Sequence, residues 1–436
     1  IYIGGKTMRT NELMLYKHME NGQILQDITF LIENYQNDYY NMEDMKGLLY
    51  DAVNEILEMA VSHGFEGDLW HNYLTYLMAS HENAYSTSCE IVGSVDGSIN
   101  QVALHDFEIF KELFDYDFAD MENVMGVDCI SMLHDYVGTS GHGSVFNQRI
   151  RDRICDLSKS LAKAETAEEF KAVITQFYKE FGVGKLGLHK AFRIAHTEEG
   201  ALIEPITKIA HVHLDDLVGY EIAKKKLIDN TKAFVEGKKA NNCLLFGDAG
   251  TGKSSSIKAI LNQYYDQGLR MIEVYKHQFQ DLNDVIAQIK NRNYKFIIYM
   301  DDLSFEEFEI EYKYLKAVIE GGLEKKPDNV LIYATSNRRH LIRETFKDKE
   351  DRDEELHTND TVQEKLSLVA RFGVTIYFGK PDKKQFQEIV RELAKKNGID
   401  MPDDELFLEA NKWELSHGGL SGRTAQQFID YLAGTR

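Results

Sequence analysis

The chain has 436 residues, of which 43% are hydrophobic and only four are proline. This composition excludes a disordered or low-complexity protein and favours a globular one with two or three domains. The four cysteines lie far apart without a C-x-x-C pair, which favours reduced thiols in a cytoplasmic protein over a disulfide framework or a zinc site. No apolar run approaches the roughly 20 residues that a membrane-spanning helix needs, so no membrane interaction is expected.

The formal net charge of −21 is unevenly distributed along the chain. Residues 1–200 carry 32 acidic and 15 basic side chains, whereas residues 201–436 carry 39 and 35. Within 20–135 the only bases are Lys46 and Lys111. This asymmetry predicts two modules with different roles and argues against a nucleic-acid partner for the first, because gripping phosphates requires clustered Lys and Arg. The acidic surface is either simply solvated or docks a basic partner.

Taken in chain order, residues 1–180 predict an acidic, mainly helical N-terminal domain. Apolar residues recur at helical spacing over 45–61. The Ser- and Gly-rich stretch 86–105 predicts a loop or a short hairpin, and the sequence TAEE predicts that Thr166 caps a helix. A linker is expected over 181–211.

The pattern changes after about residue 200, where short apolar and often β-branched runs alternate with helical stretches. Strands that alternate with helices predict a parallel sheet covered on both faces. We therefore expect a three-layer α/β core over 212–380, with a parallel five-stranded sheet, and a helical piece over 381–436. The predicted strands are 241–247, 270–276, 295–301, 329–336 and 374–379.

A phosphate-binding loop follows the first predicted strand, in the pattern G-x-x-x-x-G-K-[ST]. Its glycines allow the backbone N–H groups to point at phosphate oxygens, and the loop opens a helix whose positive end adds attraction. Lys253 is expected to reach the β- and γ-phosphates of ATP, and Ser254 to hold Mg²⁺. The predicted nucleotide-binding residues are Gly247, Asp248, Ala249, Gly250, Thr251, Gly252, Lys253, Ser254 and Ser255.

Polar side chains end the next two core strands. Asp301 and Asp302 close the run KFIIYM, so Asp301 is predicted to hold Mg²⁺ through water and Asp302 to orient the attacking water. The usual second acid is Glu, and Asp302 could instead be a strand-end cap. Asn337 closes the following strand and is the predicted γ-phosphate sensor, because ligands gather at the carboxyl ends of parallel strands. Glu306 and Glu307 are expected to start a solvated helix.

This order of features resembles that of the AAA+ ATPase superfamily, which implies a P-loop core, a helical lid and ATP hydrolysis. The segment EKLSLVARFGVTIYF resembles the one that carries the arginine finger, so the resemblance implies that Arg371 reaches a neighbouring subunit's site. GGLSGRTAQQFIDYL resembles the lid motif, which implies that Arg423 contacts the γ-phosphate. LDDLVGYEIAKKKL resembles the segment that packs on adenine, with Val218 and Gly219 at the pocket. Arg338 and Arg339, which directly follow the predicted sensor Asn337, are alternatives to Arg371 as the arginine finger.

The sequence resembles even more closely that of one bacterial AAA+ family catalogued as a domain of unknown function (815). The phrases ANNCLLFGDAGTGKSS, DDLSFEE, LKAVIEGGLEKKPDNVLIYATSNRRHL, EKLSLVARFG and SGRTAQQFI carry that resemblance over about 205–436. The family has no established substrate, so the resemblance implies an ATPase without naming what it acts on.

Three functions follow from these features. The first is an Mg²⁺-dependent ATPase that assembles with itself, for example as a hexamer, and remodels a protein assembly. The second is a nucleotide-gated switch or scaffold that hydrolyses ATP slowly and binds an unknown protein partner through its acidic N-terminal helices; the short side chain of Asp302 is its main support. The third, a DNA-associated loader, is disfavoured by the net acidity.

Overall fold

The computed structural model describes residues 7–93, 96–138, 147–198, 200–207, 209, 211–305, 311–320, 327–337, 341 and 368–435. The chain divides into two compact units, an N-terminal unit over Ile1–His189 and a C-terminal unit over Lys190–Arg436. Within the described ranges, none of the helices combines the length and the apolar character that crossing a membrane requires.

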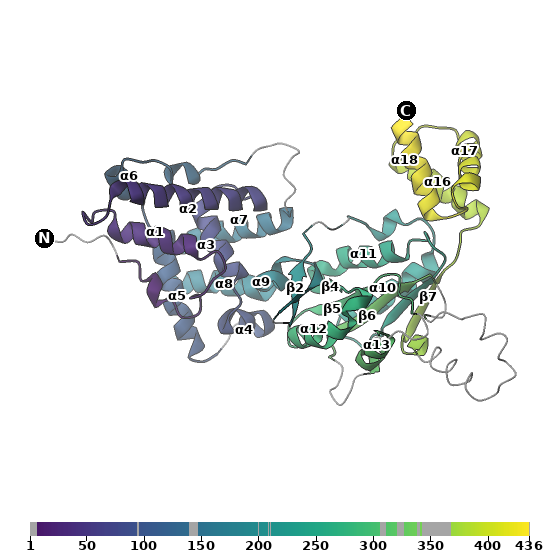
Figure 1. Ribbon diagram of the computed structural model, residues 1–436, viewed down its shortest axis with the longest axis horizontal. Helices are drawn as coiled ribbons and strands as arrows, with labels where there is room; N and C mark the ends of the chain where they lie inside the picture. Colours follow the sequence, from purple (N-terminus) through teal and green to yellow (C-terminus); the bar gives the residue numbers. More distant parts are fainter. Residues whose placement is uncertain are drawn as a thin grey trace. The chain divides into compact units, whose positions relative to one another are not determined.

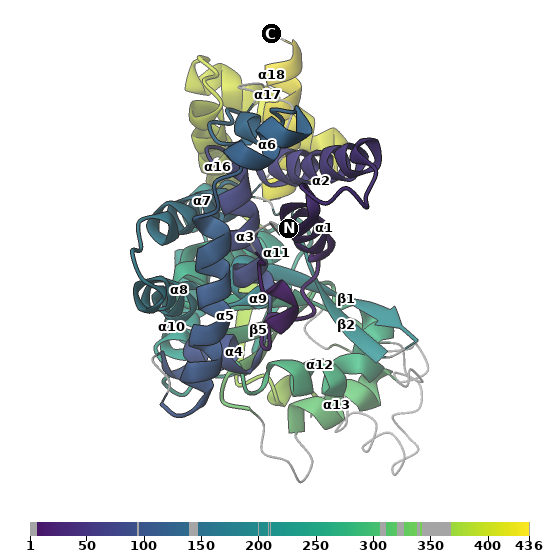
Figure 2. The same ribbon diagram turned by 90° about the vertical axis from the view of Figure 1, so that its left-hand side faces the viewer.

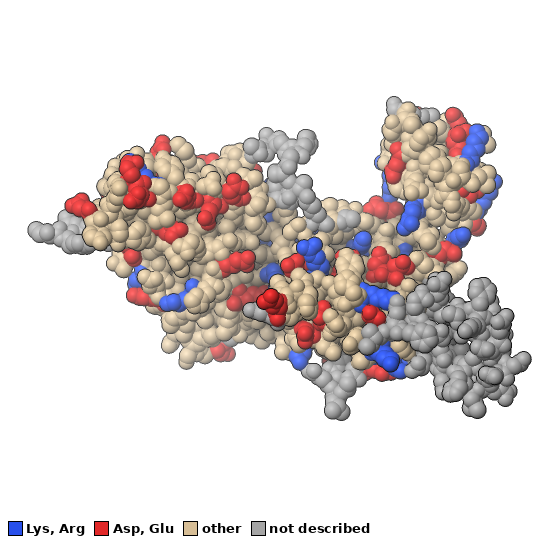
Figure 3. Space-filling model, viewed as in Figure 1, with Lys and Arg blue, Asp and Glu red and all other residues tan. Residues whose placement is uncertain are grey.

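The N-terminal unit is helical, as its sequence predicts (Figure 1). Its apolar faces meet in one core that buries Trp70, Tyr73, Phe107 and Phe170 almost completely. Asp and Glu are frequent on the face shown in Figure 3, and Lys and Arg are sparse there. The helices are α1 (Gln23–Asn34), α2 (Met42–His63), α3 (Leu69–Ser80), α4 (Ala84–Val92), α5 (Ile99–Phe114), α6 (Ala119–Met125), α7 (Gln148–Ala162), α8 (Ala167–Phe181) and α9 (Gly184–Leu188).

Local capping decides two helix starts in this unit. Thr166 accepts a hydrogen bond from the backbone N–H of Glu169 at 3.2 Å, which confirms the predicted cap of α8. The prediction of a loop or hairpin over 86–105 is wrong, because α4 and α5 occupy most of that stretch. The side chain of Asn83 accepts the N–H groups of Tyr85 and Ser86 and so starts α4 just before the Ser-rich segment.

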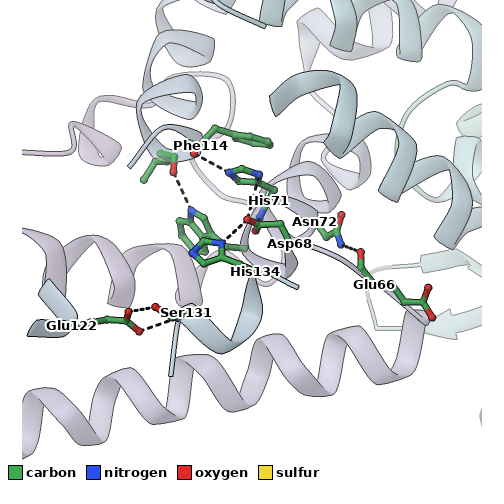
Figure 4. Close-up of polar contacts among 10 residues, drawn as sticks. Glu66, Asp68, His71, Asn72, Phe114, Glu122, Ser131 and His134 are labelled. Atoms are coloured by element: carbon green, nitrogen blue, oxygen red, sulfur yellow. Dashed lines mark hydrogen bonds and ion pairs between the residues drawn. The ribbon is translucent and has the colours of Figure 1, made fainter. Parts of the chain in front are cut away.

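Buried carboxylates in this unit hold backbone rather than facing a cleft. Asp106 is fully buried and accepts the N–H groups of Met14, Leu15 and Tyr16 at 2.7 to 3.1 Å. Glu122 accepts the N–H of Ser131 and its hydroxyl (Figure 4). Asp106 thus fixes a segment that has no regular secondary structure, and Glu122 fixes the start of the short 3-10 helix Ser131–Leu133.

The two histidines labelled in Figure 4, His71 and His134, also make contacts that stabilise the fold. His134 Nδ1 lies 2.7 Å from a carboxylate oxygen of Asp68, the residue that caps α3. His71 lies in the first turn of α3, stacks on Phe114 at 4.5 Å between ring centroids, and its Nε2 lies 2.8 Å from the Phe114 carbonyl oxygen. No group of three or more His, Cys, Asp or Glu side chains that could hold a metal ion occurs in the described part of the chain.

The C-terminal unit is built on one sheet, ordered β2-β1-β4-β5-β6-β3-β7. Its five strands β3 to β7 are the predicted ones and run parallel to one another. The prediction of a five-stranded sheet is wrong, however, because β1 joins parallel to β4 and β2 pairs antiparallel with β1. The strands are β1 (Ala191–Thr197), β2 (Gly200–Pro205), β3 (Cys243–Gly247), β4 (Leu269–Glu273), β5 (Lys295–Met300), β6 (Val330–Ser336) and β7 (Val374–Phe378).

The two additional strands lie in the stretch 181–211, for which the sequence predicts a linker. Phe192 and Ile194 of β1 are buried while Arg193 between them is exposed, so the alternation of a half-buried strand is present. The alternation of buried and exposed residues covers few positions and is bounded by charged residues. For this reason the sequence pattern predicts a linker and not a strand. Pairing with the edge of β4 is a long-range contact that the local pattern does not announce.

Helices cover both faces of this sheet and form the predicted three layers. Buried side chains on one face, among them Leu245, Tyr299 and Tyr333, pack with α10 and α11. Figures 1 and 2 show α11 on one side of the sheet and α12 and α13 on the other. The helices are α10 (Glu221–Val235), α11 (Lys253–Tyr264), α12 (Leu282–Ile289), α13 (Glu311–Glu320), α16 (Lys383–Lys396), α17 (Asp403–Ser416) and α18 (Gly422–Thr435).

The last three helices form a bundle with a core of its own, made by residues such as Phe386, Leu406 and Phe428 (Figure 1). The bundle is connected to β7 through residues 379–382. We refer to α16, α17 and α18 together as the C-terminal bundle.

Candidate nucleotide site

The glycine-rich loop joins β3 to α11 at the carboxyl edge of the sheet, where the sequence places it. Gly247, Gly250 and Gly252 have φ values of 138°, 75° and 90°, which side chains rarely tolerate. At Gly247 a Cβ atom would lie 2.1 Å from the carbonyl oxygen of Phe378 on the neighbouring strand β7. Only glycine therefore allows the loop to leave β3 in this direction and present its N–H groups ahead of α11.

Lys253 opens α11 and turns its ammonium group back over the loop. Its Nζ donates to the carbonyl oxygens of Gly247 at 3.0 Å and Asp248 at 2.6 Å, and to Asn337 Oδ1 at 3.0 Å. Burial lowers the pKa of Lys253, while the carboxylates of Asp248, Asp302 and Asp301 act in the opposite direction. The ammonium thus lies at the point where the loop meets the end of β6.

Asp301 follows β5 and meets two hydroxyl groups. Its Oδ1 accepts hydrogen bonds from Ser254 Oγ at 2.7 Å and Thr335 Oγ1 at 2.5 Å. Partial burial by itself would raise the pKa of Asp301, but the hydrogen bonds from Thr335 and Ser254 outweigh it and hold the pKa below its ordinary value. Carboxylate and hydroxyl oxygens are hard donors that suit Mg²⁺, so the residues present fit this ion.

Asp302 and Asn337 complete this end of the cleft. Asn337 Nδ2 donates to Asp302 Oδ1 at 2.7 Å, while its Oδ1 accepts from Lys253. Both residues are exposed to the cleft. The predicted base and the predicted sensor are therefore in direct contact, and the sensor also contacts the loop lysine.

A cleft of about 680 Å³ runs from these residues toward the C-terminal bundle. Ala249 to Ser255 of the glycine-rich loop and Val218 are among the residues that line it. Gly219 lines an adjoining hollow of about 420 Å³ instead, and Gly247 and Asp248 line a second one on the β7 side. The size suits a nucleotide, and the predicted loop residues fall on it or next to it.

The C-terminal bundle closes the cleft from above. The backbone N–H of Arg423 at the start of α18 donates to the carbonyl oxygen of Gly250 at 3.2 Å, and Arg423 lines the cleft. On the other side, Lys396 of α16 pairs with Asp216 at 3.0 Å and also donates to the Asp215 carbonyl. The bundle is thus bonded both to the glycine-rich loop and to the segment that precedes α10.

The comparisons with known proteins now identify the family. A family model described as "Protein of unknown function (DUF815)" matches residues 187–436, more than half of the chain. The chain belongs to this family. The matched residues include the seven-stranded sheet, the glycine-rich loop and the C-terminal bundle.

Solved structures give a more distant likeness. The chain is 16% identical to the Thermotoga maritima RuvB Holliday junction branch migration motor, covers 50% of its own length and 63% of that chain, and superimposes with a TM-score of 0.35. It is 16% identical to the FIGL-1 AAA domain in complex with ADP, over 52% of this chain and 75% of that one, with a TM-score of 0.37. The chain thus spans less than two thirds of the RuvB structure. No functionally curated protein matches the sequence.

Arg371 of this DUF815 chain lies away from the cleft. It precedes the amino end of β7, whereas the glycine-rich loop lies at the carboxyl end, beyond a strand that spans about 16 Å. Its guanidinium forms an ion pair with Glu320 of α13. The alternatives Arg338 and Arg339, and the acids Glu306 and Glu307, lie outside the described residues.

The structure also brings to the cleft residues that the sequence did not single out. Thr335 contacts both acids, and Tyr220, with φ 59°, donates from its hydroxyl to the Gly379 carbonyl where the C-terminal bundle begins. Ile389, Leu393 and residues of α18 line the roof. Thr335 could have been found from its place two residues before Asn337; the roof residues carry no local signal.

Proposed function

We propose that this DUF815 chain is an Mg²⁺-dependent ATPase that works as a homo-oligomer and remodels a protein partner. The observation that carries the proposal is the continuous set of contacts around one cleft, from Lys253 through Asn337 to Asp302. Two exposed carboxylates and an amide beside a buried ammonium group are typical of a binding or catalytic site and are not needed to stabilise the fold.

Each side chain has a role that follows from its chemistry and place. The loop N–H groups and Lys253 bind and orient the phosphates of ATP. Ser254 and Asp301 would hold Mg²⁺, which when bound neutralises charge on the phosphate oxygens. Asp302 holds the attacking water and accepts its proton, and Asn337 keeps that carboxylate oriented while sensing the γ-phosphate. Val218 and Gly219 pack on the adenine, and Arg423 contacts the γ-phosphate from the C-terminal bundle.

Self-association is part of the proposal because of where Arg371 lies. A guanidinium at the amino edge of the sheet does not reach the cleft at the carboxyl edge of the same chain, yet it can enter the cleft of a neighbour. A permanent positive charge there stabilises the charge that develops in phosphoryl transfer. Arg371, acting as an arginine finger, thus makes ATP hydrolysis depend on assembly, for example into a hexamer.

The N-terminal unit is proposed to bind the protein partner. Its 30 acidic side chains against 13 basic ones favour a basic protein surface over nucleic acid.

The test is the steady-state ATPase rate as a function of protein concentration, with light scattering on the same samples. We expect the rate per chain to rise with assembly. Asp302→Asn and Arg371→Ala should each lower kcat by about 100-fold or more. Arg391→Ala is the matched control, because Arg391 also forms a surface ion pair in the same unit, with Asp403 at 2.9 Å, and lies outside the cleft.

Two outcomes contradict the proposal. Hydrolysis by dilute monomer that is unchanged in Arg371→Ala removes the oligomeric part. Negligible turnover by the wild type, together with assembly that requires ATP, favours the slow nucleotide-gated switch instead.

A further inference from the structure

The backbone of Asp302 has an unusual conformation. Its φ of 50° lies in the left-handed region, which among the described non-glycine residues is shared only by Arg9, Asn21 and Tyr220. Aspartate tolerates this region better than most residues, but it still requires stabilisation by neighbouring groups. The chain therefore turns sharply immediately after Asp301, directly beside the proposed chemistry.

This turn explains how two adjacent acids face one cleft. In an extended strand, successive side chains point to opposite faces of the sheet. Asp301 and Asp302 both line the nucleotide cleft. The left-handed turn provides the rotation that a continued strand would not, and it brings the short carboxylate of Asp302 against Asn337.

One side chain on the neighbouring strand holds the turn. Thr335 Oγ1 accepts the backbone N–H of Asp302 at 2.9 Å and donates its own proton to Asp301 Oδ1 at 2.5 Å. The carbonyl oxygen of Thr335 accepts the N–H of Leu303 at 2.7 Å. Thr335 is buried, with 2% of its surface exposed, so water does not compete freely for these bonds.

The register of the sheet accounts for this placement. The β5–β6 ladder pairs Met300 with Ala334, so Thr335 is the residue that lies beside the strand end where β5 turns away. A hydroxyl group can donate one hydrogen bond and accept others, and Thr335 uses its donor for Asp301 and an acceptor position for Asp302. Valine has the same shape but neither function.

We propose that Thr335 is a positioning residue for the acid pair. Its hydroxyl fixes the strand-end turn that allows an aspartate at 302 to take the place of the usual longer glutamate, and it fixes the orientation of the Asp301 carboxylate for Mg²⁺. This inference rests on the proposed function and adds a residue to it. Ser254 also contacts Asp301, but its hydroxyl is itself a proposed Mg²⁺ ligand, whereas Thr335 can hold the carboxylate throughout.

The first test is Thr335→Val, which removes the hydroxyl and keeps the shape. The Mg²⁺ concentration that gives half-maximal strengthening of nucleotide binding should rise about 10-fold, since residues that hold a metal ligand in its orientation have effects of roughly 10- to 100-fold. Nucleotide affinity without Mg²⁺ should change by less than about 2-fold, because the loop and Lys253 are untouched. If ATP is hydrolysed, kcat should fall by about 10- to 100-fold with little change in KM.

Two variants separate positioning from packing. Thr335→Ser keeps the hydroxyl and should restore most of the Mg²⁺ response and of kcat. Thr231→Val is the matched control: Thr231 is a fully buried threonine of the same unit, whose Oγ1 contacts the Leu227 carbonyl at 2.8 Å and the Tyr333 hydroxyl at 2.9 Å. It should lower thermal stability but leave the Mg²⁺ response unchanged.

A double-mutant cycle tests whether Thr335 acts through Asp302. At saturating Mg²⁺, adding Thr335→Val to Asp302→Asn should lower kcat by less than a further 2-fold or so, because the base is already absent. Losses that multiply would show that Thr335 affects turnover without Asp302 and would overturn the part of the proposal in which its hydroxyl positions Asp302.

The binding readout keeps this inference separate from the proposed function. If the wild type binds nucleotide but does not hydrolyse it, the ATPase proposal fails, while the Mg²⁺ dependence of binding still tests Thr335. An unchanged Mg²⁺ dependence in Thr335→Val overturns the inference in either case. A Thr335→Ser variant as impaired as Thr335→Val would overturn it as well, since it would assign the effect to packing.

Discussion

The two units of this chain use their carboxylates in opposite ways. In the N-terminal unit the carboxylate oxygens of the buried residues Asp106 and Glu122 accept hydrogen bonds from backbone N–H groups of the same unit. In the C-terminal unit Asp301 and Asp302 contact side chains and remain exposed to a cleft. The first pattern stabilises a fold, and the second leaves charge available to a ligand.

This difference shows why only one unit suggests a chemical function. A buried acid that accepts three N–H groups has little capacity left for a ligand, whereas Asp301, bonded by two hydroxyl groups through one oxygen, and Asp302, bonded by one amide, keep an oxygen for an ion or water. Both units have one tryptophan, Trp70 and Trp413, so their unfolding can be followed separately in full-length single-tryptophan variants.

The largest expected effect tests the C-terminal half of this comparison, in which charged side chains face a ligand cleft. Lys253→Ala removes the only ammonium among the residues that line the described cleft, and it should weaken ATP binding by about 1,000-fold, or roughly 4 kcal/mol. Isothermal titration calorimetry measures the loss. The Trp70 unfolding transition should not move. Lys412→Ala, which removes an exposed lysine paired with Glu409, is the control and should bind ATP normally.

The next effect sharpens the comparison on the N-terminal side. Asp106→Ala leaves three backbone N–H groups without their acceptor, so the free energy of unfolding reported by Trp70 should fall by about 3 kcal/mol. Urea unfolding of the Trp413→Phe background measures it. ATP affinity should be unchanged, and a loss of affinity would contradict the separation of the two roles.

A suitable control for that experiment is Asp27→Ala. Asp27 is a carboxylate of the same unit that accepts from Gln23 in an exposed position. Its removal should change the unfolding free energy by less than about 0.5 kcal/mol.

Alkaline pH should affect the two units unequally. Burial raises the pKa of the thiols of Cys89, Cys129 and Cys155 in the N-terminal unit and of Cys243 in the C-terminal unit. A thiol with a raised folded pKa contributes its full stability below the unfolded pKa of about 8.5 and loses it as pH rises. As pH rises from 7 to 9.5 the Trp70 transition should therefore lose more unfolding free energy than the Trp413 transition, because three buried thiols lie in the N-terminal unit and one in the C-terminal unit.

Replacing the three N-terminal thiols by alanine tests this assignment. The extra alkaline sensitivity of the Trp70 transition should disappear in the triple variant. If it persists, groups other than the thiols are responsible.

The smallest effects should be equal in the two units. Thr166→Ala removes the N-cap of α8, and Asp382→Ala removes the capping box that Asp382 and Gln385 form at α16. Each should lower the unfolding free energy of its own unit by about 1 kcal/mol, because caps are local and do not depend on the use of the surrounding charges. Thermal unfolding followed at each tryptophan measures both; Thr166→Ser should be close to neutral.

Much of the C-terminal unit could be predicted from local patterns. The apolar runs of β3 to β7 and the spacing from Gly247 to Ser254 indicate a strand, a phosphate loop and a helix, because each is determined by contiguous residues. The strands β1 and β2 could not be predicted in this way. Their alternation of buried and exposed residues is short, and they join the sheet through the pairing of β1 with β4, which is distant in the sequence. Nor did the serines of 86–105 reveal α4, whose start depends on a single cap at Asn83.

The sequence by itself determined the charge division of the chain, the phosphate loop and the order of the core strands, since composition, periodicity and spacing are properties of neighbouring residues. Only the tertiary structure decided that Thr335 lies against Asp301 and Asp302, that Arg371 lies at the opposite edge of the sheet from the cleft, and that Arg423 lies over Gly250. Those relations depend on the register between strands and on the packing of a helix against a loop. Such contacts join residues that are far apart in the chain, so no local pattern encodes them.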